Sequence, residues 1–279
     1  MAKLLVNKVT AAHMKDLAAS DAAVILISGA TGSGKSEIAS ALAEKILGSA
    51  TESLVNKGQL FVIDGNSAGI EDVRGIIKRI SIKSSEQRIF LIKNVDGLGH
   101  EAQNALLKTL EQLPPTTRFI MTTTHPEAVL PTIRSRAASF SVRPVSLAEA
   151  KKFYGEQANE IEKYWSMSGG LAGELKQLIK NDSPLDAAIS DAKEFLSLGN
   201  YERLIFIDKY AANRENLQLF SNALLRILKA ATPGAAEKNQ ANLKRLVKAR
   251  KTLMDLTLAL SANASTKLVA LKLATSLEV

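Results

Sequence analysis

The feature that most constrains this chain is a glycine-rich turn between an apolar stretch and a helical stretch. Residues 22–28 are apolar and rich in β-branched side chains, which is typical of a buried strand. Apolar residues recur at helical spacing over 38–46. Between these stretches the sequence fits the phosphate-loop pattern G-x-x-x-x-G-K-[ST] in full, with the residues Gly29, Ala30, Thr31, Gly32, Ser33, Gly34, Lys35 and Ser36.

The chemistry of this turn favours a polyphosphate ligand. Glycines let the backbone curl so that successive N–H groups point inward, where they and the N-terminus of the following helix hold phosphate oxygens. In this pattern Lys35 reaches the β- and γ-phosphates, and Ser36 ligates Mg²⁺. We therefore predict a site for ATP or ADP with Mg²⁺. The alternative is a chance glycine turn, which the strand before it and the helix after it disfavour.

Composition sets wider limits. The 279 residues suggest about two domains, and 46% hydrophobic residues suffice for packed cores. Because cysteine is missing, disulfides and thiolate zinc sites are excluded; we expect no zinc and a cytoplasmic location. The N-terminus lacks a signal-peptide core, and no apolar run has membrane-spanning length, so we expect no membrane partner. The net charge of +8 fits a nucleic-acid partner, although an ordinary basic surface explains it equally well.

Residues 1–145 alternate apolar strands with amphipathic helices. We predict helices at 10–19, 35–46, 70–80 and 100–113, and strands at 22–28, 59–63, 88–92, 118–123 and 138–142. We interpret 48–58 as a loop. This alternation predicts a parallel sheet with helices on both faces, because each strand returns through a right-handed crossover.

After Pro144 the pattern changes to helices alone. Gly169-Gly170 separates two helical stretches, 181–184 is interpreted as a linker, and we expect a helix break at 232–234. The sequence thus predicts a nucleotide-binding α/β domain over 1–145, a small helical domain over 146–183 and a larger all-α domain over 184–279.

Carboxylates are missing from the place where ATP hydrolysis requires them. A later buried strand of a phosphate-loop ATPase usually ends in acidic residues that hold the Mg²⁺ shell and orient the attacking water. Here the strand at 88–92 is followed by Lys93 and Asn94, and neither can act as a carboxylate base. Asp96 lies further on, where a water could bridge it to the site.

Four segments resemble the core of bacterial clamp-loader subunits, which are AAA+ proteins of the DNA polymerase III holoenzyme. These segments are Gln103 to Glu111, Pro114-Pro115, Arg118 to Thr123 and Leu130 to Arg136. The resemblance is dense over 22–145 and looser beyond. It implies an AAA+ parallel sheet followed by a helical lid domain and a helical collar domain. It also implies other clamp-loader subunits in a hetero-oligomeric ring, a sliding clamp and primed DNA as partners, and a role in DNA replication.

Within that family, the departures point to the delta-prime type. The gamma/tau motor subunits keep an acidic pair at the positions of Lys93 and Asn94, and they carry a γ-phosphate-sensing arginine where this chain has Ala172. Ser135-Arg136 matches the start of the family's Ser-Arg-Cys motif, with Ala137 in place of the cysteine. The resemblance therefore implies that Arg136 is an arginine finger acting on a neighbour's ATP.

Some assignments stay open. Thr124 stands where the family has its first sensor residue and is included in the predicted nucleotide site, although a threonine there is more often only a strand end. One alternative is an active gamma/tau-like motor in which Asp96 takes over metal binding. The other is a non-enzymatic interaction module with a vestigial phosphate loop.

Overall fold

The computed structural model describes residues 4–82, 84–155, 158–180, 184–238, 240–261 and 264–277. The chain divides into two compact units. The first comprises Met1–Phe153 with Leu171–Glu174, and the second Tyr154–Gly170 with Leu175–Val279. The predicted three-part division at 145 and 183 stays a prediction.

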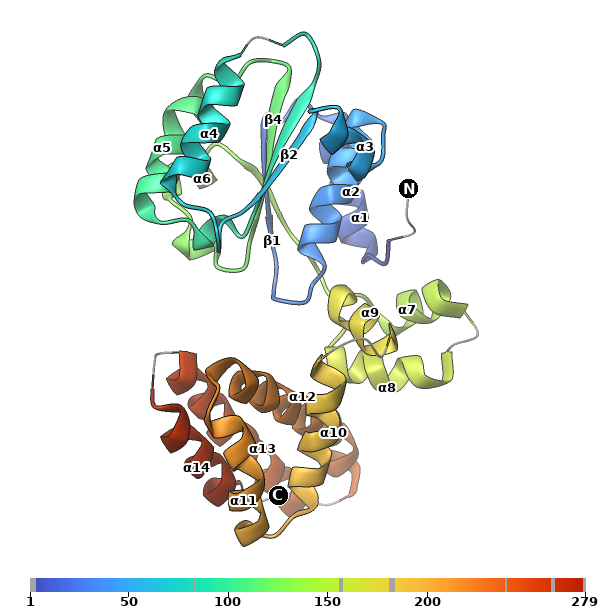
Figure 1. Cartoon of the computed structure of the whole chain (residues 1–279). Coiled ribbons are helices and arrows are strands. Elements are labelled where there is room, and N and C mark those ends of the chain that lie inside the picture. The colour runs from blue at the N-terminus through green and yellow to red at the C-terminus, as the bar shows by residue number, and fades with distance from the viewer. Residues whose placement is uncertain are drawn as a thin grey trace. The chain divides into compact units, whose positions relative to one another are not determined.

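A five-stranded parallel sheet forms the centre of the first unit (Figure 1). Its strands are β1 (Val24–Ser28), β2 (Leu60–Asp64), β3 (Arg88–Lys93), β4 (Thr117–Thr123) and β5 (Ala138–Ser141), in the spatial order β2-β3-β4-β1-β5. Since all strands are parallel, their carboxyl ends meet at one edge of the sheet. The predicted parallel sheet is confirmed.

Helices cover both faces of this sheet (Figure 1). Along β1, Ile25 and Ile27 pack on one face and Val24 and Leu26 on the other, because successive strand residues point to opposite sides. The first face holds α1 (Lys8–Ala19), α2 (Lys35–Leu47) and α3 (Thr51–Asn56). The second holds α4 (Ile70–Ser81), α5 (His100–Glu111) and α6 (Pro131–Arg134). Two 3₁₀ turns, η1 (Val95–Gly97) and η2 (Pro126–Ala128), and helix α7 (Leu147–Tyr154) complete the list.

Two sequence expectations were wrong. The segment 48–58 contains helix α3, which buries Leu54 completely and begins where Glu44 accepts bonds from the N–H and hydroxyl of Thr51, at 2.9 and 2.8 Å. Such a short helix has too few apolar positions to show a period. The break at 232–234 does not occur, because α12 (Arg214–Lys238) runs through Pro233. A proline removes one helical hydrogen bond, and here the helix continues despite that loss.

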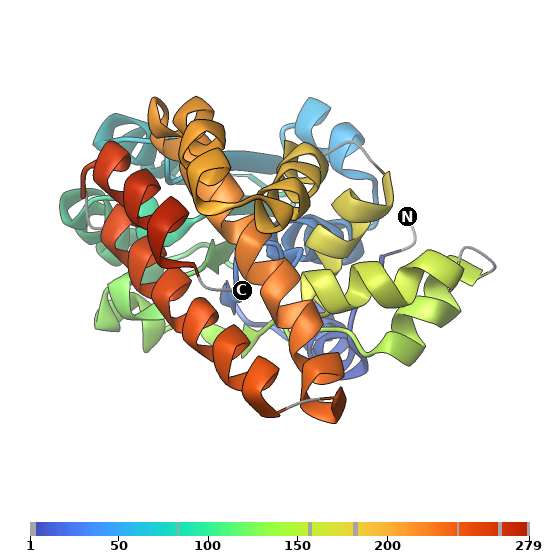
Figure 2. The same cartoon turned by 90° about the horizontal axis from the view of Figure 1, so that it is seen from below.

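In the second unit, all regular secondary structure of the described residues is helical. Its helices are α8 (Ala158–Ser168), α9 (Ala172–Lys180), whose first turn belongs to the first unit, α10 (Pro184–Ser197), α11 (Asn200–Ala211), α12, α13 (Gln240–Ser261) and α14 (Thr266–Ser276). The long helices α12 and α13 pack along each other (Figure 2). Phe195 and Phe220 are fully buried at the centre of its core.

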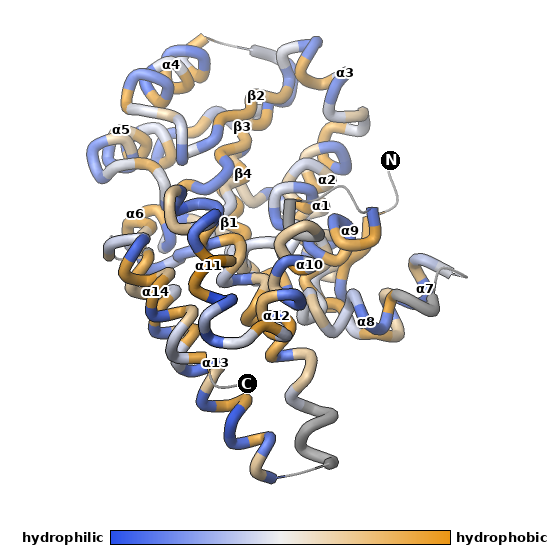
Figure 3. Tube along the Cα trace, turned by 60° about the horizontal axis from the view of Figure 1, so that its bottom comes forward, coloured by the Kyte–Doolittle hydropathy of each residue, from blue (hydrophilic) through white to orange (hydrophobic). Residues whose placement is uncertain are grey.

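Hydropathy follows this architecture. The sheet strands are coloured mostly as hydrophobic, whereas the helices alternate between hydrophobic and hydrophilic positions (Figure 3). A parallel sheet covered on both faces requires the first pattern, and a helix with one buried side requires the second. None of the helices that the structure describes combines the length and apolar character needed to cross a bilayer.

Candidate nucleotide-binding site

The phosphate loop joins the carboxyl end of β1 to the first turn of α2, as predicted. Gly32 and Gly34 have φ angles of +78° and +84°, a left-handed conformation that L side chains rarely adopt. The N–H of Gly29 donates to the carbonyl of Thr123 at 3.1 Å, so the loop begins bonded to the end of β4. The two glycines are therefore required by the shape of the loop.

The residues of this loop fit a polyphosphate. Ser33 is only 2% exposed, and its Oγ has no hydrogen-bond partner among the described residues. Ala30 and Thr31 are exposed at the tip of the loop, and Ser36 lies half-buried in the first turn of α2. The helix N-terminus adds a positive dipole end at the same place. Ser36 is the residue that would hold Mg²⁺, and within the described part of the chain no group of three His, Cys, Asp or Glu residues comes together as a metal site.

Lys35 is enclosed by the loop that it belongs to. Its side chain is 7% exposed, and its Nζ lies 3.5 Å from the carbonyl oxygen of Ala30. Burial lowers the pKa of this amine, while the charges of Asp96 and Glu37 act in the opposite direction. A buried ammonium is costly unless it is paired, so an anionic ligand in the loop would be attracted to Lys35 directly.

Asp96 is bonded to the residues that follow β4. Its Oδ2 accepts the backbone N–H of Thr124 at 3.3 Å and that of His125 at 3.1 Å. The carboxylate thereby caps two amides at the carboxyl edge of the sheet, and its charge still reaches Lys35. The structure thus brings Asp96, Lys35 and the backbone of Thr124 to one region.

Lys93 and Asn94 occupy the end of β3, where acidic residues would be needed for catalysis. Lys93 is the last residue of the strand, and Asn94 adopts a left-handed conformation with φ of 51°. The backbone N–H of Asn94 donates to Thr122 Oγ1 at 3.0 Å, and its Nδ2 donates to Asp64 Oδ1 at 3.1 Å. These contacts hold the turn together. Neither Lys93 nor Asn94 supplies a carboxylate, and the one bonded here belongs to Asp64 at the end of the neighbouring strand β2.

The segment Leu171–Glu174 packs on the phosphate loop within the first unit. The backbone N–H of Glu174 donates to the carbonyl of Gly32 at 2.9 Å. A Cβ added to Gly173 would lie 3.0 Å from both the Gly32 oxygen and the Gly34 nitrogen, which is tighter than ordinary contact. A side chain at residue 173 would therefore require the two backbones to move apart by a few tenths of an ångström.

Arg136 lies at the other edge of the sheet. It precedes β5, whose Ala138 is paired with Ile25 at the beginning of β1, whereas the phosphate loop follows the end of β1. Its guanidinium pairs with Glu111 Oε1 at 2.6 Å and donates to the carbonyl of Thr132 at 2.9 Å. The side chain is 38% exposed, so it is presented to solvent and kept away from its own loop.

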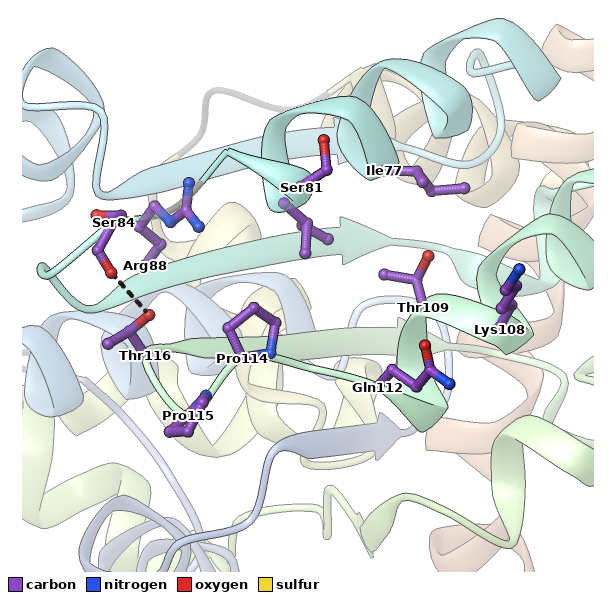
Figure 4. Close-up of a pocket in the computed structure, with 11 residues that line it drawn as sticks. Ile77, Ser81, Ser84, Arg88, Lys108, Thr109, Gln112, Pro114, Pro115 and Thr116 are labelled. Carbon is purple, nitrogen blue, oxygen red and sulfur yellow. Dashed lines mark hydrogen bonds between the residues drawn. The ribbon is translucent and has the colours of Figure 1, made fainter.

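A cavity of about 700 Å³ also lies at this other edge, between α4 and α5 (Figure 4). Arg88, which begins β3, and Thr116, which precedes β4, form part of its wall, and Ile77, Ile80 and Pro114 form much of the rest. Because it lies at the amino ends of the strands, this cavity is separate from the phosphate loop.

Comparison with known proteins identifies the family. A family model described as DNA polymerase III, delta subunit, matches residues 6–146, which are 141 of the 279 residues. The chain belongs to this family.

Relatives and solved structures agree with that membership. The replication factor C small subunit of Thermoplasma acidophilum is 32% identical over 167 residues, which are 56% of this chain and 51% of that protein. The same subunit of Methanococcus maripaludis is 29% identical over 182 residues, covering 60% of this chain and 55% of that protein. The chain thus spans about half the length of the curated relatives it matches.

A crystal structure of a DNA polymerase III gamma subunit-related protein from Thermotoga maritima has the same fold. It superposes with a TM-score of 0.62 at 18% identity and covers 94% of this chain and 97% of that one. The family match and the curated relatives support an AAA+ subunit of the clamp-loader type, and this crystal structure adds that the fold is shared.

Sequence reasoning missed three contacts of the candidate functional residues. The pairing of Glu111 with Arg136, the capping of β4 by Asp96 and the packing of Glu174 on Gly32 all join residues far apart in sequence. Glu111 belongs to one of the segments that resemble the clamp-loader core, but no local pattern links its side chain to Arg136. No local pattern around Ala172 indicates that Gly173 and Glu174 lie on the phosphate loop.

Proposed function

We propose that this chain is a delta-prime-like clamp-loader subunit that binds ATP or ADP with Mg²⁺ at Gly29–Ser36 and hydrolyses it poorly. The observation that carries this proposal is an intact phosphate loop beside a strand end without carboxylates. The loop has the backbone and the lysine that polyphosphate binding needs. Lys93 and Asn94 cannot take the part of the acidic pair.

The bonding of Asp96 supports poor hydrolysis. A catalytic carboxylate must direct its lone pairs toward a water or toward the metal shell. The Asp96 carboxylate already accepts two backbone N–H groups at the end of β4. It serves as a structural cap, which argues against the alternative in which this residue takes over metal binding in an active motor.

The placement of Arg136 supports a role in trans. An arginine finger stabilises the charge that develops on the transferring phosphoryl group. Arg136 and the phosphate loop lie at opposite edges of one sheet, so this guanidinium cannot reach a nucleotide in its own loop. The guanidinium can therefore act only on the nucleotide of an adjacent subunit, and its ion pair with Glu111 keeps it at the surface.

The partners of this proposal come from the family. Other clamp-loader subunits would form a hetero-oligomeric ring with this chain, and the ring would load a sliding clamp onto primed DNA in the cytoplasm. The net charge of +8 is compatible with work near DNA.

Nucleotide binding and hydrolysis by the isolated chain test the proposal. We expect labelled ADP and ATP to bind in the presence of Mg²⁺, Lys35→Ala to abolish binding, and steady-state hydrolysis to stay far below that of the reconstituted complex. Lys45→Ala, on an exposed position of the same helix α2, is the matched control. Turnover at motor-subunit rates that depends on Lys35 would show an active ATPase instead. Failure of the folded chain to bind either nucleotide would show a vestigial loop.

A further inference from the structure

One carboxylate lies against the phosphate loop without a place in the proposed function. Glu174 is 6% exposed, and its N–H bond to the Gly32 carbonyl fixes its backbone on the loop. A Cβ added to Gly32 would lie 3.1 Å from the Cβ of Glu174 and 3.5 Å from both its Cδ and its Oε2. The carboxylate itself, and not only the backbone, is therefore next to the loop.

The approach is built into both backbones. Gly32 has no side chain, and its positive φ disfavours one. On the other side, Gly173 lies so close to Gly34 that an added Cβ would meet its nitrogen at 3.0 Å. Glycine on each side lets the start of α9 rest directly on the loop, which sets the position of the side chain that follows Gly173.

We propose that Glu174 is a specificity-determining residue of the nucleotide site, which weakens the binding of polyphosphates and weakens ATP more than ADP. This inference rests on the proposed binding of nucleotide at the loop. Like charges repel most strongly where water is excluded, and a buried carboxylate is screened little by salt. ATP carries one negative charge more than ADP, so the repulsion grows from ADP to ATP and vanishes for an uncharged nucleoside.

The attraction of Lys35 and the repulsion of Glu174 therefore act on the same ligand in opposite directions. Lys35 and the loop amides bind the phosphates, and Glu174 reduces the preference for the triphosphate. The site is thereby biased toward a nucleotide with fewer charges. A subunit with this bias retains bound ADP more readily than it exchanges the ADP for ATP.

The test compares Glu174→Gln with the unaltered full-length chain by isothermal titration with ADP, ATP and adenosine. Glutamine keeps the size of the side chain and the backbone bond to Gly32 but removes the charge. We expect roughly tenfold tighter binding of ATP, a smaller gain for ADP and no gain for adenosine. Glu52→Gln, an exposed first-turn residue of α3, is the matched control and leaves all three affinities unchanged.

The outcomes separate this inference from the function on which it rests. Unchanged ATP affinity in Glu174→Gln overturns the role of Glu174 and leaves nucleotide binding intact. An equal gain for adenosine also overturns it, because a charge effect cannot act on a neutral ligand. If neither folded protein binds ATP or ADP, the proposed function fails and this inference falls with it. Thermal unfolding of each variant verifies that it is folded, and Glu174→Ala provides a second neutral side chain.

Discussion

Replacement of Arg136 by alanine tests the proposed role of this residue at the ATP of a neighbouring subunit. The change removes an ion pair with Glu111 whose two side chains are 38% and 49% exposed. Exposed pairs of this kind contribute at most about 1 kcal/mol to folding. We therefore expect Arg136→Ala to fold normally, with an unfolding free energy within about 1 kcal/mol of the original.

The chain's own nucleotide affinity should not change in this variant. Ala138 is paired with Ile25, and Gly29 lies four residues further along β1, which at roughly 3.3 Å per residue is about 13 Å. Arg136 lies two residues before Ala138, on the side away from the loop. This separation exceeds the Debye length of about 8 Å at physiological ionic strength, so the exposed charge is screened from the loop.

The effect should appear at the ATP of the adjacent subunit. An arginine finger contributes about 10³-fold or more to phosphoryl transfer. A reconstituted complex in which the adjacent subunit carries the only functional phosphate loop isolates that single site. We expect its turnover to fall by about 10³-fold in Arg136→Ala, and Arg136→Lys to recover little, because lysine lacks the planar guanidinium.

Arg134→Ala is the matched control, because Arg134 is an exposed arginine in the same turn. It should leave turnover unchanged. The reasoning is refuted if Arg136→Ala keeps full turnover, if Arg134→Ala loses as much, or if Arg136→Ala weakens nucleotide binding by the isolated chain.

Two further predictions concern the helical unit. Phe220 is fully buried and stacks on Tyr210, with ring centroids 4.3 Å apart. Phe220→Ala should lower the free energy of unfolding, measured in urea, by about 3–5 kcal/mol. Leu258→Ala, at a position 66% exposed, should lower it little, and similar losses for both variants would contradict the assigned core. Asp191 is the second case. Burial raises the pKa of its carboxyl, but the bonds from Lys209 and Tyr210 together lower this pKa by more than burial raises it, so the pKa lies below its ordinary value. A carboxyl group whose pKa is depressed in the folded state stabilises the fold at pH values above its pKa in the unfolded chain, about 3.9, and this stabilisation is lost as pH falls through the folded pKa. The melting temperatures at pH 7 and pH 3 should therefore differ less in Asp191→Asn than in the original chain. An unchanged difference would rule out this linkage.

Local patterns predicted the five strands of the first unit, its helices α1, α2, α4 and α5, and the phosphate loop. A strand, a loop glycine and an amphipathic helix each depend on residues close together in sequence, so Gly32, Gly34 and Lys35 were identifiable from spacing alone. The same dependence explains the errors. Helix α3 is too short to show a period, and the continuation of α12 through Pro233 goes against the local preference of proline.

The sequence by itself thus determined a parallel sheet with a phosphate-loop pattern and identified the positions, Lys93 and Asn94, where carboxylates are missing. Only the tertiary structure decided what the remaining charged groups do. It paired Arg136 with Glu111 at the edge away from the loop, committed Asp96 to backbone amides, and placed the Glu174 carboxylate beside Gly32. The physical reason is that these contacts depend on strand order and register between distant segments, which no local periodicity encodes.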